Sequence, residues 1–214
     1  MIVGVRLSMK ITNKIELNPI LKQCSAILFD LDGTLFDLHA NWPSIKQYIL
    51  SHYQKSYGDS INPQLPFREI FQTIEERHNR DTAQFYLDYM RDQELISIQD
   101  QRLTPLWLMR QGLDKISEIV NSECFFGIVS NNFHDSLMEI LKVYNLTDRF
   151  RVVIGRDDVT RPKPDPEGIH RVLKTFDLSP ERVLFTGDMT TDEQVAHTTH
   201  THFIYADKFT LFMK

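Results

Sequence analysis

Two aspartates one residue apart are the first feature of the sequence that could do chemistry. Asp30 and Asp32 follow the apolar run at residues 26–29 and are followed by Gly33 and Thr34. The run is typical of a buried parallel strand, and open α/β sheets place their binding sites at the carboxyl ends of such strands. Gly33 permits a turn that would point the two carboxylates in different directions. One acid could then act as nucleophile or metal ligand while the other donates and takes back a proton.

Further polar groups stand after apolar runs or in loops later in the chain. They are Ser130 with Asn131, Lys163 between two prolines, and Asp188 with Asp192. Each has an ordinary alternative: Ser130 and Asn131 could cap a helix, Lys163 could be a solvated lysine, and Asp192 could be a first-turn acid favoured by the helix dipole. The two leading acids could likewise belong to a solvated turn. Their joint occurrence, in this order and at strand ends, favours a common site.

Apolar periodicity predicts the elements that must position these residues. Strand-like runs lie at residues 125–129, 152–154, 183–186 and 203–205, and apolar residues with helical spacing alternate with them. Asp165 and Pro166 indicate the cap and first turn of one of these helices. The alternation predicts a parallel α/β sheet covered on both faces.

Two other regions differ from this pattern. Residues 38–106 carry apolar stripes with helical spacing and are too many for a structureless loop, so we expect a helical insertion within a core formed by residues 1–37 and 107–214. Its aromatic stripes are expected in the interior of the insertion. Residues 1–23 have a loosely helical spacing that Pro19 interrupts, which indicates an arm packed on the core.

Composition excludes several classes of protein. The 214 residues are 42% hydrophobic and 25% charged, as in ordinary globular proteins, and a net charge of -5 without a basic cluster argues against nucleic acid as partner. Cys24 and Cys124 are too few and too far apart for a disulfide framework or a cysteine zinc site, which fits a cytoplasmic protein. No apolar run approaches the roughly 20 residues that span a membrane, so no membrane partner is expected.

Taken together, the polar motifs resemble those of the haloacid dehalogenase-like (HAD) hydrolase superfamily over about residues 26–205. The matching positions are Asp30-Leu31-Asp32-Gly33-Thr34, Ser130 after an apolar strand, Lys163, and Gly187-Asp188-Met189-Thr190-Thr191-Asp192. The resemblance implies an α/β fold with a Rossmann-like core, and it implies that the insertion is a helical cap that closes over the site.

The resemblance and the chemistry of the acids imply the same metal. Crowded carboxylates repel one another unless a cation joins them, and Mg²⁺ prefers hard oxygen ligands. We therefore expect Mg²⁺ as cofactor, held by Asp30, Asp188 and the backbone carbonyl of Asp32, with Asp192 nearby. Asp30 would attack phosphorus and form an aspartyl phosphate, and Asp32 would serve as acid and then as base.

The remaining motif residues are expected to bind the substrate. Ser130 and Asn131 would bind phosphoryl oxygens, Lys163 would neutralise their charge and hold Asp30 in place, and Thr34 belongs to the same substrate-binding set. Asp32 favours phosphatases over dehalogenases, because an alkoxide leaving group needs a proton and a halide does not. The expected function is an Mg²⁺-dependent phosphatase acting on a small phosphorylated metabolite.

Other interpretations stay open at this point. A phosphomutase of sugar phosphates could use the same residues, and a non-enzymatic binding module could share the fold. His197, His200 and His202 could form a second metal site, although solvated or packed histidines are the commoner case. Substrate specificity should come from the insertion, where the candidates are His39, Arg68, Arg77, Arg80 and Arg91.

Overall fold

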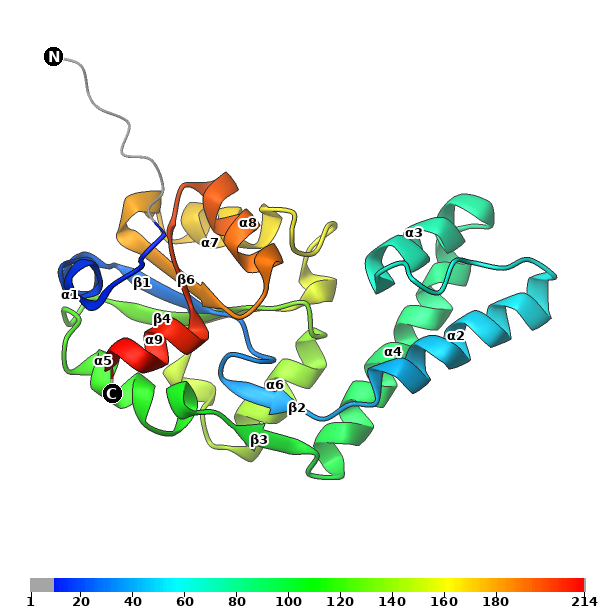
Figure 1. The fold of residues 1–214 in the computed structure, drawn as a ribbon, viewed down its shortest axis with the longest axis horizontal. Coiled ribbons are helices and arrows are strands. Elements are labelled where there is room, and N and C mark those ends of the chain that lie inside the picture. The colour runs from blue at the N-terminus through cyan, green and yellow to red at the C-terminus, as the bar shows by residue number, and fades with distance from the viewer. Residues whose placement is uncertain (1–9, 214) are drawn as a thin grey trace, which may run out of the picture. The chain divides into compact units, whose positions relative to one another are not determined.

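The computed structural model describes residues 10–213 of the chain, and these form two compact units (Figure 1). The first unit contains the described residues up to Leu38 and those from Leu103 on, and the second contains His39–Arg102. Within residues 10–213, none of the helices has the length and apolar character needed to cross a bilayer.

A five-stranded parallel sheet is the centre of the first unit. Its strands are β1 (Ala26–Phe29), β4 (Phe125–Val129), β5 (Val152–Ile154), β6 (Val183–Gly187) and β7 (His202–Tyr205). Their order is β5-β4-β1-β6-β7, and every neighbouring pair is parallel. All four residues of β1 are buried, as the apolar run predicts for a central strand. The predicted parallel α/β architecture is confirmed.

Helices cover both faces of this sheet (Figure 1): α7 and α8 lie on one side, and α5 and α6 on the other. The helices of the unit are α1 (Lys14–Gln23), α5 (Leu113–Ser117), α6 (His134–Val143), α7 (Glu167–Thr175), α8 (Thr190–Thr199) and α9 (Ala206–Met213). A π-helical turn (Leu108–Gly112) leads into α5, and 3-10 turns occupy Thr147–Arg149, Arg156–Asp158 and Pro180–Arg182.

The connections place a topological switch point beside β1. From β1 the chain builds outward through β4 to β5, then returns to β6 on the other side of β1 and continues to β7. Right-handed crossovers put the helices of the β1-β4-β5 half and those of the β6-β7 half on opposite faces of the sheet. The connections that leave β1 and β6 therefore run in opposite directions. A crevice at the carboxyl ends of these two strands is where this class of fold binds ligands.

Alternate residues of β1 anchor it to the two covering layers. Leu28 packs in a cluster with Ile169 of α7, Val195 of α8 and Phe185 of β6. Phe29 points the other way, and its ring meets that of Phe126 edge-on with 5.6 Å between centroids. Because β1 is packed on both faces, Asp30, which follows it directly, has a fixed position.

The structure corrects two details of the expected helix boundaries. Pro19 does not interrupt α1 but lies inside it, because burial of Leu17 and Leu21 outweighs the loss of the one hydrogen bond that Pro19 cannot donate. Helix α7 has Pro166 as N-cap instead of in its first turn. The carboxylate of Asp165 accepts the Glu167 N–H at 3.0 Å and so still caps the helix start.

A short antiparallel pair lies where the chain leaves the first unit and re-enters it. Strand β2 (Phe36–Leu38) pairs with β3 (Leu103–Pro105), with Phe36 opposite Pro105. The Leu106 N–H donates to the Leu35 carbonyl at 2.9 Å. These hydrogen bonds join the chain segment that leads into the insertion to the one that leads out of it. Both segments therefore belong to the first unit.

The second unit is helical, with α2 (Trp42–Tyr57), α3 (Phe67–Arg77) and α4 (Arg80–Gln99). Its interior includes Ile49, Ile74 and the fully buried Tyr53. The aromatic stripes are only partly interior, because Tyr86 is buried while Tyr89 is half-buried and Phe85 is 52% exposed. The expectation that these stripes lie in the interior of the insertion is therefore only partly correct.

Candidate active site

The pairing of β1 with β6 brings the predicted acids together. The Asp30 N–H donates to the Thr186 carbonyl at 2.9 Å, so the ladder continues to the residue that carries the first carboxylate. Asp188 follows two residues after Thr186. Carboxylate oxygens of Asp30, Asp188 and Asp192 all lie within 4.8 Å of one another. Three acids separated in sequence thus meet at the switch point of the sheet.

Two glycines make this close approach possible. Gly33 has a φ of 76°, a left-handed conformation that other residues adopt only with strain. A Cβ at Gly33 would also collide with the carboxylate of Asp188, and a Cβ at Gly187 would collide with that of Asp192. Both glycines therefore leave room for an acid and not only for a turn.

Asp32 bonds to strand β2, whereas Asp30 and Asp192 pair with Lys163. Its Oδ1 accepts the Leu38 N–H at 2.8 Å, which fixes the orientation of the carboxyl group. Burial, followed by the charges of Asp30, Asp37 and Asp188, raises the pKa of Asp32 to about 6. A carboxyl group with this pKa can carry a proton near neutral pH, which is what a general acid requires.

Lys163 forms a buried ion-pair network with two of the acids. The side chain is only 5% exposed, and its Nζ lies 2.9 Å from Asp30 Oδ1 and 2.6 Å from Asp192 Oδ1. The ammonium group also lies over the ring of Phe185, 5.3 Å from the centroid. Burial by itself would lower the pKa of Lys163, but the two carboxylates outweigh burial and raise it. Lys163 is therefore a fixed positive charge next to Asp30.

Asp192 has a supporting position within this network. Its Oδ1 accepts a hydrogen bond from Lys163, and its Oδ2 accepts the Met189 N–H at 3.0 Å at the start of α8. The side chain is almost completely buried. Asp192 thereby connects Lys163 to the start of α8. Because Met189 follows Asp188 directly, this connection also fixes the position of Lys163 relative to Asp188.

The loop after β4 carries Ser130 and two asparagines. Ser130 Oγ donates to Asn132 Oδ1 at 2.9 Å and accepts the Asn132 N–H at 3.3 Å. Asn131 Nδ2 donates to the Lys163 carbonyl at 3.0 Å. Sequence reasoning missed Asn132, which is 6% exposed; its only signal was a second asparagine in Ser-Asn-Asn.

Several buried oxygens of this edge have no hydrogen-bond partner among residues 10–213. They include Thr34 Oγ1, Asn131 Oδ1 and Thr186 Oγ1. Leaving a buried polar atom unpaired costs about 1–3 kcal/mol, so such atoms are uncommon in purely structural regions. Their concentration around the acids is typical of a site built to meet a ligand.

The charges of the site fit a divalent cation. Asp30, Asp188 and Asp192 together with Lys163 leave a net negative charge, to which Asp32 adds when ionised. Burial, followed by the charges of Asp30 and Asp192, raises the pKa of Asp188 to about 6. Such a shift reports carboxylates that lack sufficient positive charge, and hard carboxylate oxygens are ligands that suit Mg²⁺.

The histidines near the C-terminus do not form a comparable cluster. His197 and His200 are exposed, and His202 Nε2 lies 3.0 Å from the Glu181 carbonyl oxygen. Within the part of the chain that the structure describes, the three aspartates are the only group of potential ligand side chains with metal-site spacing. The alternative of a second, histidine-based metal site is therefore not supported.

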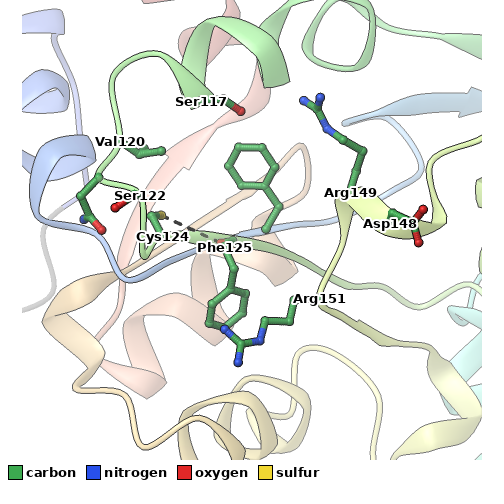
Figure 2. Close-up of a pocket in the computed structure, with 10 residues that line it drawn as sticks. Ser117, Val120, Ser122, Cys124, Phe125, Asp148, Arg149 and Arg151 are labelled. Carbon is green, nitrogen blue, oxygen red and sulfur yellow. Dashed lines mark hydrogen bonds between the residues drawn. The ribbon is translucent and has the colours of Figure 1, made fainter.

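A pocket of about 600 Å³ lies at the opposite, amino-terminal end of β4 (Figure 2). Three of its polar side chains already have partners in the protein: Asn121 Nδ2 donates to the Cys24 carbonyl at 2.7 Å, Arg149 pairs with Asp114 at 2.8 Å, and Arg151 lies over the Phe125 ring. The arginines extend in different directions from the pocket (Figure 2). These side chains stabilise the fold and do not converge on a ligand.

The cysteines are also unsuited to catalysis. Burial raises the pKa of Cys24 to about 12 and that of Cys124 to about 11. Both are free thiols, and a thiol with such a pKa is a poor nucleophile at neutral pH. Nucleophilic chemistry in the described residues is therefore better served by the aspartates.

The specificity candidates of the second unit divide into two groups. Arg77 pairs with Asp59 at 2.6 Å, and Arg91 pairs with Asp88 at 3.3 Å. Arg68, Arg80 and His39 are exposed. Arg77 and Arg91 are thus engaged within the unit itself.

Comparison with known proteins agrees with this geometry. Residues 27–206 match the family of haloacid dehalogenase-like hydrolases. The chain is 31% identical over 170 residues to pyrophosphatase PpaX of Listeria welshimeri, an alignment that covers 77% of this chain and 74% of the relative.

Solved structures show the same fold. A protein from Bacteroides fragilis assigned to the same family superposes with a TM-score of 0.64 at 24% identity, covering 84% of this chain and 86% of the other. CbbY from Rhodobacter sphaeroides, solved with phosphate, gives a TM-score of 0.62 at 16% identity, covering 85% of each chain. With the match over residues 27–206, these findings confirm the predicted family: the chain belongs to the haloacid dehalogenase-like hydrolases and is a hydrolytic enzyme.

Proposed function

We propose that the protein is an Mg²⁺-dependent phosphatase that hydrolyses a small phosphorylated metabolite through an aspartyl-phosphate intermediate. The observation that carries this proposal is the pairing of Asp30 with Lys163 beside two further carboxylates. A buried ammonium 2.9 Å from its Oδ1 holds the Asp30 carboxyl group in a fixed orientation, which a nucleophile needs. The lysine also supplies positive charge for the phosphoryl oxygens.

The reaction has two steps, in which Asp30 and Asp32 have separate roles. In the first, Asp30 attacks phosphorus and the bond to the leaving oxygen breaks, while Asp32 gives that oxygen its proton. In the second, Asp32 takes a proton from water, and the water oxygen attacks phosphorus. The bond to Asp30 then breaks, which releases phosphate and restores both acids. The raised pKa of Asp32 supports a group that alternates between these two states.

The remaining motif residues bind the transferred group. Asn131 donates a hydrogen bond to a phosphoryl oxygen, Ser130 does so when its hydroxyl turns from Asn132 to the substrate, and Lys163 neutralises the charge of these oxygens as it develops. Thr34, whose buried hydroxyl has no partner in the described chain, completes the set. We expect this group of donors to contribute more to the rate than to ground-state binding.

Magnesium fits the acids of the same edge. Asp30, Asp188 and the backbone carbonyl of Asp32 would hold it, with Asp192 supporting from nearby. When bound, Mg²⁺ supplies the positive charge that offsets the crowded carboxylates and the phosphoryl oxygens. The second unit, His39–Arg102, would act as a helical cap that supplies contacts to the rest of the substrate.

A substrate screen tests the proposal. Pyrophosphate belongs first in the panel because the Listeria relative is a pyrophosphatase, followed by small carboxylic-acid phosphates and sugar phosphates. Phosphate release is expected with Mg²⁺ and not with EDTA. Release that EDTA leaves unchanged, or interconversion of sugar phosphates without free phosphate, would contradict the proposal.

A further inference from the structure

The backbone of Lys163 is held by a single side chain. Asn131 Nδ2 donates to its carbonyl oxygen at 3.0 Å, and among residues 10–213 this is the only hydrogen bond to the Lys163 backbone. Pro162 and Pro164 flank the lysine and have no N–H to donate. The segment therefore depends on Asn131 for its connection to the loop that follows β4.

The orientation of the Asn131 amide follows from its partner. A backbone carbonyl can only accept, so the nitrogen of the carboxamide must face Lys163. One of the two N–H groups of Nδ2 is used there, and the other is left for the substrate. A role in holding the lysine is thus compatible with a contact to a phosphoryl oxygen.

The lysine is fixed at both of its ends. Its Nζ lies 2.9 Å from Asp30 and 2.6 Å from Asp192, while its carbonyl is bound by Asn131. A flexible four-carbon stem joins these two ends, and a lysine side chain loses rotamer entropy when it is ordered. If the backbone shifted, the ammonium group could keep its contact with the acids only by changing the direction from which it approaches them.

We propose that Asn131 is a positioning residue for Lys163: it sets the place of the lysine backbone and thereby the approach of the ammonium group to Asp30 and the phosphoryl group. This inference rests on the proposed phosphatase function. Because a misplacement of about 1 Å can reduce a rate about 100-fold, Asn131→Ala should lower kcat/KM by about 10- to 100-fold, with most of the loss in kcat.

A double-mutant cycle separates positioning from direct binding of the substrate. The loss caused by Asn131→Ala is measured once in the wild-type background and once in Lys163→Met, after circular dichroism has verified that each variant is folded. If Asn131 acts through the lysine, the loss should be at least about threefold smaller in the Lys163→Met background, and what remains there is the direct contact of Asn131 with the phosphoryl group. An equal loss in both backgrounds would overturn the proposal.

A second measurement needs neither turnover nor the double variant. Reductive methylation of lysines, followed by peptide mass spectrometry, reports how accessible the Lys163 amine is. Asn131→Ala should increase the labelling rate of Lys163 several-fold, whereas Asn62→Ala, which removes the same group from an exposed turn of the second unit, should leave it unchanged. Unchanged labelling in Asn131→Ala would reject the positioning role of Asn131 even if the phosphatase assay succeeded. Increased labelling without any phosphatase activity would reject only the proposed function.

Discussion

The two ends of the central sheet differ in how far their polar groups are satisfied within the protein. At the carboxyl ends of β1 and β6, Asp32 and Asp188 have pKa values raised to about 6, and buried oxygens lack partners. At the amino end of β4, Asn121 and Arg149 are paired with groups of the protein. Folding stability accounts for the second arrangement but not for the first, so we propose that the carboxyl ends of β1 and β6 bind the ligand.

The largest effect should come from the proposed nucleophile, Asp30. Asp30→Asn keeps the size of the side chain but removes its nucleophilic charge, so kcat should fall by about a thousandfold or more. Arg149→Ala at the opposite end of the sheet is the matched control and should stay within about twofold of wild type. Steady-state phosphate release measures both. Similar losses in the two variants would remove the functional distinction between the ends.

A smaller loss is expected for the acid, and it should depend on the leaving group. Asp32→Asn cannot supply a proton, so hydrolysis of an alkyl phosphate should slow by about 100- to 10,000-fold. An aryl phosphate with an acidic phenol needs less protonation and should be affected less. Rates across a series of leaving groups test this, and a loss that is independent of the leaving group would contradict the assigned role.

Magnesium should stabilise the protein in a pH-dependent way. The folded-state pKa values of Asp32 and Asp188 lie above the ordinary value of 3.8, so the folded protein holds protons that the unfolded chain has lost. This contribution to stability is complete below about pH 4 and is lost as pH rises through about 6. A cation bound at Asp188 replaces the proton of that carboxyl group, and Mg²⁺ at about 100 times its Kd should add about 2.7 kcal/mol.

Thermal melts with and without Mg²⁺ check this expectation. The increase in Tm should be about 5–11 °C at pH 8 and much smaller at pH 5, where Asp188 is largely protonated. Asp188→Asn should remove most of the increase at pH 8. An increase of equal size at both pH values would show that these carboxylates do not bind the ion.

The smallest effect on activity should come from the satisfied end. Asn121→Ala leaves the carbonyl of the buried Cys24 without its partner, which should cost about 1–3 kcal/mol of unfolding free energy. Because no group of the acidic site is involved, kcat should not change. Urea unfolding and the phosphatase assay measure the two quantities, and a fall in kcat at unchanged stability would argue for coupling between the ends.

The sequence was informative where a structure depends on runs of residues. The apolar segments that became β1, β4, β5 and β6 were predicted because buried parallel strands need continuous apolar residues. Strands β2 and β3 were not predicted, since three residues each are too few to show a period. Pro19 was misread because burial of Leu17 and Leu21 is a tertiary effect that local propensity does not contain.

The same distinction applies to the site. Asp30, Asp188 and Asp192 could be grouped in advance because strand ends of a parallel sheet share one edge. The hydrogen bond from Asn131 to Lys163 joins residues 32 positions apart through two loops, and no sequence period encodes such a contact. Asn132 was missed for a similar reason, since asparagine after a strand is an ordinary loop residue until its contact with Ser130 is known.

Trapping the covalent intermediate tests the central claim most directly. The protein would be mixed with a substrate found in the screen, quenched in acid within milliseconds, digested and examined by mass spectrometry. The account predicts a phosphoryl group on the peptide that contains Asp30, absent in Asp30→Asn. A phosphoryl group on another residue, or rapid turnover with no phosphorylated peptide at any quench time, would contradict it.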